Sequence, residues 1–167
     1  MNYWLMKTEP SEFSFDDLVA CTNSTDHWQG VRNYQARNLM RDEFRLGDLV
    51  FIYHSRTPDP AIVGIAEVVR EAYPDPTALD KKSPYFDSKS HENGQSRWVM
   101  VDVAAKLRFK HAVTLSSMRG LCHNSSDNRQ GSLSNMTLLR PGMRLSVQPV
   151  STHEWQTITQ LGCPYLI

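Results

Sequence analysis

Aromatic rings, guanidinium groups and amides are crowded together in residues 28–37, with the sequence WQGVRNYQAR. Trp28 and Tyr34 offer flat faces on which a nucleobase can stack, an interaction worth about 1–3 kcal/mol per base. Asn33 and the backbone beside Gly30 can pair with the edge of a base that has left its stack. The same composition also suits a buried tryptophan beside a solvated helix, because tryptophan is highly buried on average. The segment predicts either a base-binding pocket or an ordinary core tryptophan.

A second polar group follows an apolar run that is typical of a strand. Tyr53, His54 and Ser55 come after residues 49–52 and precede a loop rich in proline. Polar groups at the end of a strand commonly line a binding site. The alternative is a hydrolase with Ser55 as nucleophile and His54 as base, but neighbouring residues of an extended chain point to opposite faces. We therefore favour binding over catalysis for these residues.

Lys7, Thr8 and Glu9 lie at the end of the first strand-like run, directly before Pro10. Proline has no backbone N–H and interrupts strand pairing, so this segment is predicted to leave the sheet with its backbone groups exposed. The sequence contains no Gly-x-Gly-x-x-Gly motif, no Walker loop and no histidine and cysteine spacing suited to zinc. We expect no cofactor and no metal ion.

Short strands must position these residues, and they dominate the predicted secondary structure. Runs rich in β-branched and aromatic residues indicate strands. These runs are residues 3–6, 49–53, 61–69, 98–103 and 145–147. Helices are predicted after Ser14 and Ser151, each of which begins a capping box, and at residues 34–41 and 114–118.

Long polar stretches occupy residues 71–96 and 120–135, and we expect both to be loops. Loops of more than about 12–15 residues are usually functional or mobile. No internal repeat divides the chain, so residues 1–167 are predicted to form a single domain. The predicted fold class is α+β, with a mixed, barrel-like sheet and short helices packed at its ends.

Charge and composition exclude several classes of protein. The chain has 18 basic and 18 acidic residues, so bulk positive charge cannot hold a nucleic acid or a membrane. The charges are unevenly spread, because residues 1–96 carry a formal charge of −5 and residues 97–167 one of +5. No run suits a membrane span, no secretory signal is visible, and the three cysteines lack a pairing pattern. We expect a cytoplasmic protein with reduced thiols.

Five motifs together resemble one known family. They are YWLMKTEP at residues 3–10, WQGVRNYQAR at 28–37, GDLVFIYHS at 47–55, IVGIAEV at 62–68 and RLSVQPV at 144–150. In order, and over nearly the whole chain, they are similar to the EVE domain family. That family belongs with the PUA-like folds and is related to the YTH domains, which read N6-methyladenine in RNA. The resemblance implies a PUA-like mixed β pseudobarrel of five to six strands with flanking short helices.

The resemblance also implies a pocket for a modified base and no catalysis. Cytosine derivatives in DNA are the favoured ligands, with RNA as an alternative. By likeness to the YTH pattern, Trp28 matches the first aromatic of the cage around the base, and residues 7–9 match the segment that meets the base edge. Tyr73 lies in the region of the second cage aromatic. The family includes bacterial single-domain proteins, so a cytoplasmic location is expected, or a nuclear one for a eukaryotic member.

We therefore predict a non-enzymatic, nucleic-acid-binding module that recognises a modified base. The predicted pocket contains Lys7, Thr8, Glu9, Trp28, Gly30, Val31, Arg32, Asn33, Tyr34, Tyr53, His54, Ser55 and Tyr73. Phosphate contacts are predicted for Arg37, Lys106, Arg108 and Lys110. The alternative is a small hydrolase or nucleotide-processing enzyme that uses the same pocket, with His54 or Glu9 as its base. A protein-interaction module is a third possible function, which is favoured only if the aromatic segment is buried in the core.

Overall fold

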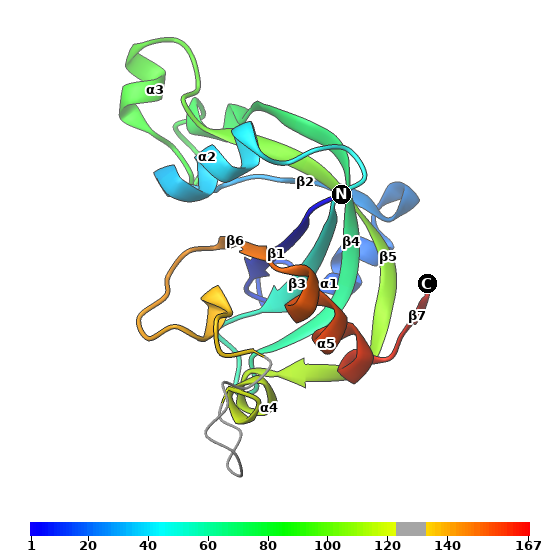
Figure 1. Cartoon of the computed structure of the whole chain (residues 1–167). Helices are drawn as coiled ribbons and strands as arrows, with labels where there is room; N and C mark the ends of the chain where they lie inside the picture. Colours follow the sequence, from blue (N-terminus) through cyan, green and yellow to red (C-terminus); the bar gives the residue numbers. More distant parts are fainter. Residues whose placement is uncertain (123–132) are drawn as a thin grey trace.

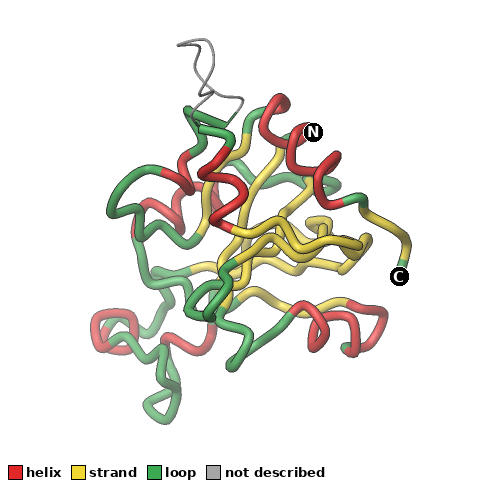
Figure 2. Tube along the Cα trace, turned by 90° about the horizontal axis from the view of Figure 1, so that it is seen from below, coloured by secondary structure: helices red, strands yellow, loops and turns green. Residues whose placement is uncertain are grey.

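The computed structural model describes residues 1–122 and 133–167 of the chain. Its strands are β1 (Tyr3–Thr8), β2 (Thr25–Trp28), β3 (Leu49–His54), β4 (Ala61–Pro74), β5 (Val99–Thr114), β6 (Val147–Val150) and β7 (Pro164–Leu166). Its α-helices are α1 (Phe15–Ala20), α2 (Tyr34–Asp42), α3 (Ser88–Glu92), α4 (Leu115–Gly120) and α5 (Thr152–Gly162). Short 3-10 helices are η1 (Thr22–Ser24), η2 (Pro76–Ala78) and η3 (Thr137–Leu139). The strands form the centre of the molecule and the helices lie around them (Figure 1, Figure 2).

The strands of the described chain form one mixed sheet of seven. Its order is β2-β5-β4-β3-β1-β6, with β7 paired to β5. β1 runs parallel to β3, with Tyr3 opposite Leu49, and the other pairs are antiparallel. Within the described residues the sheet is not closed, because β2 and β6 are its two ends. The expected α+β pseudobarrel is confirmed, with more strands than the five to six that the resemblance implied.

Two long strands curve around the molecule (Figure 1). β4 has 14 residues and β5 has 16, and their register shifts at four places between Ile62 and Tyr73. Bulges of this kind bend a strand and increase its twist. The bending allows a single open sheet to wrap around an apolar interior.

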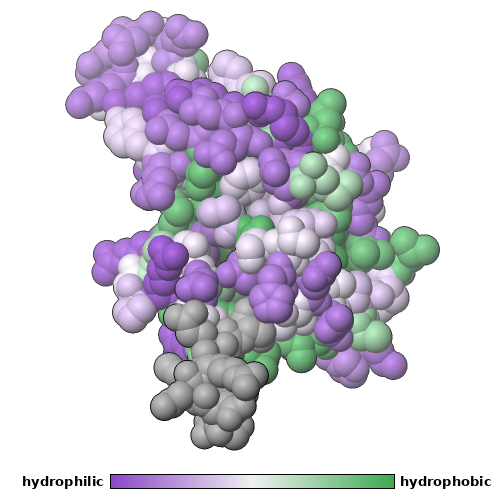
Figure 3. Space-filling model, in the orientation of Figure 1, coloured by the Kyte–Doolittle hydropathy of each residue, from purple (hydrophilic) through white to green (hydrophobic). Residues whose placement is uncertain are grey.

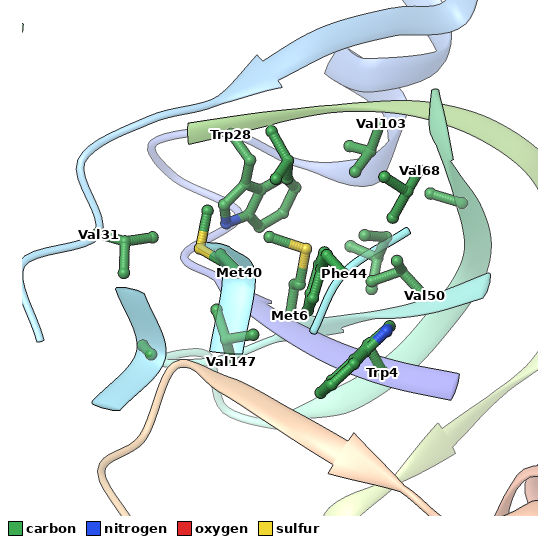
Figure 4. Packing of buried hydrophobic residues seen from close by; sticks show 14 of the residues in the cluster. Trp4, Met6, Trp28, Val31, Met40, Phe44, Val50, Val68, Val103 and Val147 are labelled. Atoms are coloured by element: carbon green, nitrogen blue, oxygen red, sulfur yellow. The ribbon is translucent and has the colours of Figure 1, made fainter. Parts of the chain in front are cut away.

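Apolar side chains pack on both faces of the sheet. Along β1, Trp4 and Met6 belong to one buried cluster and Leu5 to the other, as the alternation of a strand requires. Helices α1 and α2 cover the first cluster, and α4 and α5 cover the second. Figure 4 shows the first cluster, in which Trp28 from β2 lies near Met6 and Met40. The core therefore consists of two apolar clusters, one on each face of the sheet.

A buried carboxylate sets the register of the two parallel strands. Asp48 is 1% exposed and accepts hydrogen bonds from the Asn2 amide at 2.8 Å, the Arg45 amide at 3.0 Å and Trp4 Nε1 at 3.0 Å. Three donors compensate for the removal of this carboxylate from water. Thr8 lies opposite His54 at the other end of the same pair, so Asp48 helps to place the polar residues that follow both strands.

The predicted helices are confirmed, and two of them begin as the capping boxes indicate. Ser14 and Asp17 cap α1 reciprocally, and Ser151 and Glu154 cap α5 in the same way. The helices predicted at 34–41 and 114–118 correspond to α2 and α4. No helix of the described chain is long and apolar enough to cross a membrane.

Several elements differ from the prediction, including the strand predicted at 98–103, which continues to Thr114 as β5. Residues 71–96 are not one loop, because β4 continues to Pro74 and is followed by η2 and α3. The strand predicted at 145–147 instead covers Val147–Val150, and β2 and β7 were not predicted. Most of the second predicted loop, residues 123–132, lies outside the described residues. Bulges in β4 explain the difference at residues 71–74, because they break the alternation that marks a strand in a sequence.

Candidate functional site

A cavity of about 530 Å³ opens where β1 and β2 end, and we call it the large cavity. Its size is within the range of small-molecule sites, about 300–1,000 Å³. Its walls come from the turn after β1, the segment after β2, the loop after β3 and the residues before β6. The lining residues are Lys7, Thr8, Glu9, Glu12, Phe13, Asp26, His27, Trp28, Gln29, Gly30, Val31, Arg32, Ser55, Arg56, Tyr85, Arg144 and Ser146.

Three aromatic side chains form part of this lining. Trp28 is 9% exposed and meets the ring of Phe13 edge-on, with ring centroids 6.4 Å apart. Tyr85 is 38% exposed and lies on the other side of Gly30. The Trp28 ring is thus both a core side chain and a cavity wall, whereas the Tyr85 ring packs on Gly30 and is more exposed. Flat apolar walls of this kind suit a planar aromatic ligand.

Gly30 is required where it stands, between Trp28 and the cavity mouth. Its φ of +79° lies in the region that side chains other than glycine rarely adopt. A Cβ at this position would also lie 2.7–2.8 Å from atoms of the Tyr85 ring. The absence of a side chain therefore lets Tyr85 approach the backbone at the mouth of the cavity.

An arginine and a buried aspartate connect this wall to residues 75–98, which we call the arm. Arg32 donates to Asp75 Oδ2 at 2.8 Å, to Thr77 Oγ1 at 2.9 Å and to the Tyr85 carbonyl at 2.8 Å. Asp75 also accepts from the Gly30 amide at 2.9 Å. Burial alone would raise the pKa of Asp75, but hydrogen bonds from Thr77, Arg32 and Gly30 bring it below its usual value. Arg32 thus holds the arm and Tyr85 in place.

The arm projects from the rest of the molecule and carries α3 (Figure 1). Its surface and that of α2 are mainly hydrophilic, whereas apolar side chains gather near β7 (Figure 3). Arg97 closes the base of the arm with hydrogen bonds from its Nε and Nη2 to Asp87, at 2.8 and 2.7 Å. The hydrogen bond from Arg97 holds the pKa of Asp87 well below its usual range. The Arg97–Asp87 pair thus fastens the arm internally, and Arg32 joins the arm to the segment after β2.

The floor of the cavity is polar and comes from the ends of β1 and β3. Thr8 Oγ1 donates to the Phe13 carbonyl at 2.7 Å, and the Ser55 amide donates to the Thr8 carbonyl at 2.8 Å. Glu9 pairs with Arg56 at 3.0 Å. Lys7 is half-buried, and this burial lowers the pKa of its amine. The floor thus combines fixed hydroxyl and backbone groups with a lysine and a carboxylate.

The structure brings eight of the predicted pocket residues together and places five elsewhere. The eight that line the large cavity are Lys7, Thr8, Glu9, Trp28, Gly30, Val31, Arg32 and Ser55. Asn33 caps α2, because its Oδ1 accepts from the Ala36 amide at 3.0 Å. Tyr34 is half exposed and stacks on Trp98, with ring centroids 4.9 Å apart.

The remaining three predicted pocket residues, Tyr53, Tyr73 and His54, also lie outside the large cavity. Tyr53 lines a separate, smaller cavity. Tyr73 donates a short hydrogen bond to Asp102, and burial together with this bond raises the pKa of Tyr73 to about 12. His54 Nε2 accepts from the Phe15 amide at 3.0 Å, and burial lowers the pKa of His54. None of these three side chains lines the large cavity.

The hydrolase alternative depends on His54 or Glu9 as a general base. The acceptor nitrogen of His54 is already bonded to Phe15, and Glu9 is paired with Arg56. The Ser55 hydroxyl donates to the Thr8 carbonyl at 3.2 Å. The His54 acceptor nitrogen is thus directed at Phe15 and not at Ser55, and Glu9 has an arginine as its partner. No group of three or more potential metal ligands occurs among the described residues.

The predicted phosphate contacts lie away from both cavities. Lys106 and Arg108 both lie on β5. Lys106 pairs with Glu67 at 3.0 Å, and Arg108 pairs with Asp16 at 2.5 Å. Lys110 is exposed further along this strand, and Arg37 donates to the Arg97 carbonyl at 3.1 Å. The basic half of the sequence therefore does not form a single basic face through these residues.

Sequence reasoning missed several residues of the large cavity. Phe13 and Tyr85 are its other aromatic walls, and Arg56 and Arg144 add positive charge. Tyr85 lies 12 residues beyond Tyr73, within the segment that was expected to be a loop. A proline-rich segment of this length was the only signal, and it gave no reason to choose one tyrosine over the other.

The protein-interaction alternative was tied to burial of the aromatic segment. Trp28 and Val31 are indeed buried in the first core cluster. Both also line the large cavity, so their burial does not remove them from a binding site. Trp28 and Val31 thus pack in the core and also line the large cavity.

Comparison with known proteins places the chain in a family. The family model of the EVE domain matches residues 2–161. The chain belongs to the EVE domain family. This EVE domain is 41% identical over 170 residues to thymocyte nuclear protein 1 of Gallus gallus, a match that covers 95% of this chain and 68% of the relative.

Solved structures share the fold of this EVE domain over nearly its whole length. A crystal structure of a Pseudomonas putida protein has 42% identity and a TM-score of 0.84, and the match covers 95% of this chain and 98% of that one. The human THYN1 protein, solved in complex with 5-methylcytosine-containing DNA, has 37% identity and a TM-score of 0.87. That match covers 97% of this chain and 98% of the human one.

Proposed function

We propose that this EVE domain is a non-enzymatic reader that binds a modified base of a nucleic acid in the large cavity. A modified cytosine in DNA is the first choice of ligand, and a modified base in RNA is the second. The observation that carries the proposal is the combination of aromatic walls with a polar floor in that cavity. A relative with 37% identity was solved with 5-methylcytosine-containing DNA, which supports the choice of ligand.

The cavity offers a base two kinds of contact. Tyr85, Phe13 and the exposed part of Trp28 can contact the faces and any added methyl group, since methylation increases apolar surface. Lys7, Glu9 and the backbone of residues 28–31 can contact polar atoms on the base edge. Arg32 acts indirectly, because its hydrogen bonds to Asp75 and Tyr85 hold the aromatic wall.

The proposal is tested with oligonucleotides that differ only at one base. Binding is measured by fluorescence anisotropy for matched strands with cytosine, 5-methylcytosine or 5-hydroxymethylcytosine, as single-stranded DNA, double-stranded DNA and RNA. We expect the modified strands to bind more tightly and to be recovered chemically unchanged by mass spectrometry. Equal affinity for all three bases would contradict the modified-base proposal, and a changed strand would contradict the absence of catalysis.

A matched pair of tyrosine variants tests the position of the site. Tyr85→Ala removes an exposed ring from the cavity, whereas Tyr165→Ala removes a half-exposed ring on β7 that lines neither cavity. We expect Tyr85→Ala to weaken binding of the modified strand by about 1–3 kcal/mol, which is the value of one stacked base. Tyr165→Ala should bind like the wild type. Equal binding by both variants would remove Tyr85 from the site.

A further inference from the structure

A second cavity of about 310 Å³, which we call the small cavity, lies beside the large one. Five cationic side chains line it: Lys7, Arg56, Arg119, Arg140 and Arg144. No carboxylate is among its lining residues in the described part of the chain. Convergence of like charges is unfavourable unless an anion or solvent compensates them.

These cations have few internal partners. Arg56 pairs with Glu9 at 3.0 Å, and Lys7 donates to the Met143 carbonyl at 3.4 Å. Within residues 1–122 and 133–167, no salt bridge involves Arg119, Arg140 or Arg144. All three are exposed. On β5, by contrast, Lys106 and Arg108 both pair with carboxylates. Four of the five cations, all except Arg56, thus have no carboxylate partner within the described residues.

Three separate segments bring the arginines together, since Arg140 and Arg144 lie in the same stretch between η3 and β6. Arg56 follows β3, Arg119 lies in the last turn of α4, Arg140 follows η3, and Arg144 precedes β6. Arg56 has a φ of +52°, an uncommon value for a residue other than glycine. Strained backbone of this kind often occurs at binding sites. The fold therefore gathers charges that are up to 88 positions apart in the sequence, from Arg56 to Arg144.

The two cavities are adjacent to each other. Lys7, Ser55, Arg56 and Arg144 line both, so these residues form a shared wall. A nucleotide with its base in the large cavity would have its sugar and phosphate at the mouth of that cavity. The neighbouring arginines then lie in position for phosphate groups of the same strand. Phosphate contacts of this kind supply affinity and orientation without reading sequence.

We propose that the small cavity binds phosphate groups of the nucleic-acid strand next to the recognised base. This inference rests on the proposed function, because it takes the large cavity as the site of the base. It replaces Lys106, Arg108 and Lys110 as the phosphate-contacting residues. The planar guanidinium groups of Arg119 and Arg140 suit phosphate oxygens, since arginine can donate two parallel hydrogen bonds.

The test compares two double variants that remove the same net charge. Arg119→Gln with Arg140→Gln changes two residues that line only the small cavity. Lys81→Gln with Lys89→Gln changes two exposed residues of the arm that line neither cavity. Binding of short single-stranded DNA, with cytosine or 5-methylcytosine, is measured by anisotropy between about 50 and 200 mM salt. Circular dichroism verifies that each variant is folded.

We expect the arginine variant to bind both strands roughly tenfold or more weakly at low salt. The magnitude of its negative slope of log affinity against log salt should decrease by about 1.4, because each phosphate contact contributes about 0.7 for a single strand. The ratio of affinities for the two strands should stay the same, and the lysine variant should bind like the wild type. Equal binding by the two variants would overturn the proposal. A comparable loss in Lys106→Gln with Lys110→Gln would also overturn it.

Two further measurements separate this inference from the proposed function. The free nucleoside 5-methyl-2′-deoxycytidine has no phosphate, so the arginine variant should bind it like the wild type. If the wild type does not distinguish the two strands but still loses affinity in the arginine variant, the modified-base proposal fails and this inference stands. Inorganic phosphate is the other probe. If it binds as tightly as the oligonucleotide, the small cavity is a site for a free anion, which contradicts the strand proposal.

Discussion

The two cavities share a wall but differ in how their residues are fixed. The wall of the large cavity includes core and buried groups, because Trp28 packs in the apolar interior and Asp75 accepts four hydrogen bonds from Gly30, Arg32 and Thr77. The small cavity is lined by exposed arginines on separate segments. A rigid wall suits recognition of shape, and peripheral charge suits attraction of a polyanion. Substitutions in the first should therefore cost stability as well as binding, and substitutions in the second binding alone.

The largest effect is expected at Trp28. Its ring is 9% exposed and packs beside Met6 and Met40, so Trp28→Ala should lower the free energy of unfolding by about 3–5 kcal/mol. Trp28→Phe keeps an aromatic wall and should lose less. Urea denaturation followed by circular dichroism measures both. A loss below about 1 kcal/mol in Trp28→Ala would show that the ring is a surface wall and not part of the core.

Asp75 is expected to show the next largest effect. Asp75→Ala leaves the Gly30 amide without its acceptor and removes the carboxylate that pairs with Arg32, which should cost about 3 kcal/mol of stability. It should also free Tyr85 and weaken the preference for a modified base. Asp80→Ala is the matched control, since Asp80 is exposed on the same arm. If Asp75→Ala and Asp80→Ala unfold at the same urea concentration, the buried network does not hold this wall.

A fall in pH should affect the contribution of His54 to stability but not the charge of the arginines in the small cavity. The half-buried His54 has a lowered pKa, so below the ordinary histidine value of about 6.5 the unfolded chain binds a proton more readily than the folded one. Stability contributed by neutral His54 is complete above that value and is lost as the pH falls through it. Asp16 and Asp17 oppose the effect of burial only in part. Arginines stay charged throughout this range.

A non-titrating variant isolates this effect. In His54→Gln the side-chain oxygen can accept from the Phe15 amide and does not titrate, so its stability should depend less on pH. We expect the stability of the wild type to fall more steeply than that of His54→Gln between about pH 7 and pH 5. The measurement is urea denaturation at each pH. Parallel curves for the two proteins would show that His54 does not titrate differently in the folded state.

Local signals in the sequence were sufficient for the parts of the fold that depend on neighbouring residues. The capping boxes at Ser14 and Ser151 placed α1 and α5 because each involves side chains three positions apart. The cavity residues on β1 and β2 were also identified, since Lys7, Thr8 and Trp28 belong to motifs carried by the family resemblance. These features require no knowledge of distant contacts.

The rest of the site depends on contacts between distant segments. Tyr85 reaches the cavity because Arg32, 53 positions away, bonds to its carbonyl, and no local pattern marks that pair. Asn33 looked suited to a base edge, but its side chain caps α2 instead. The arginines of the small cavity come from three segments, which follow β3, end α4 and join η3 to β6. Sequence patterns gave the residue types, and tertiary contacts decided which of them meet.

The smallest effect on stability is expected for the arginines of the small cavity. Arg119→Gln with Arg140→Gln changes two exposed side chains that have no salt bridge within the described residues, so stability should stay within about 0.5 kcal/mol of the wild type. Relief of repulsion among neighbouring cations would offset the loss of favourable charge at the end of α4. Thermal denaturation at low and high salt measures the balance. A large loss of stability would show that these arginines support the fold, and the contrast between the two cavities would then disappear.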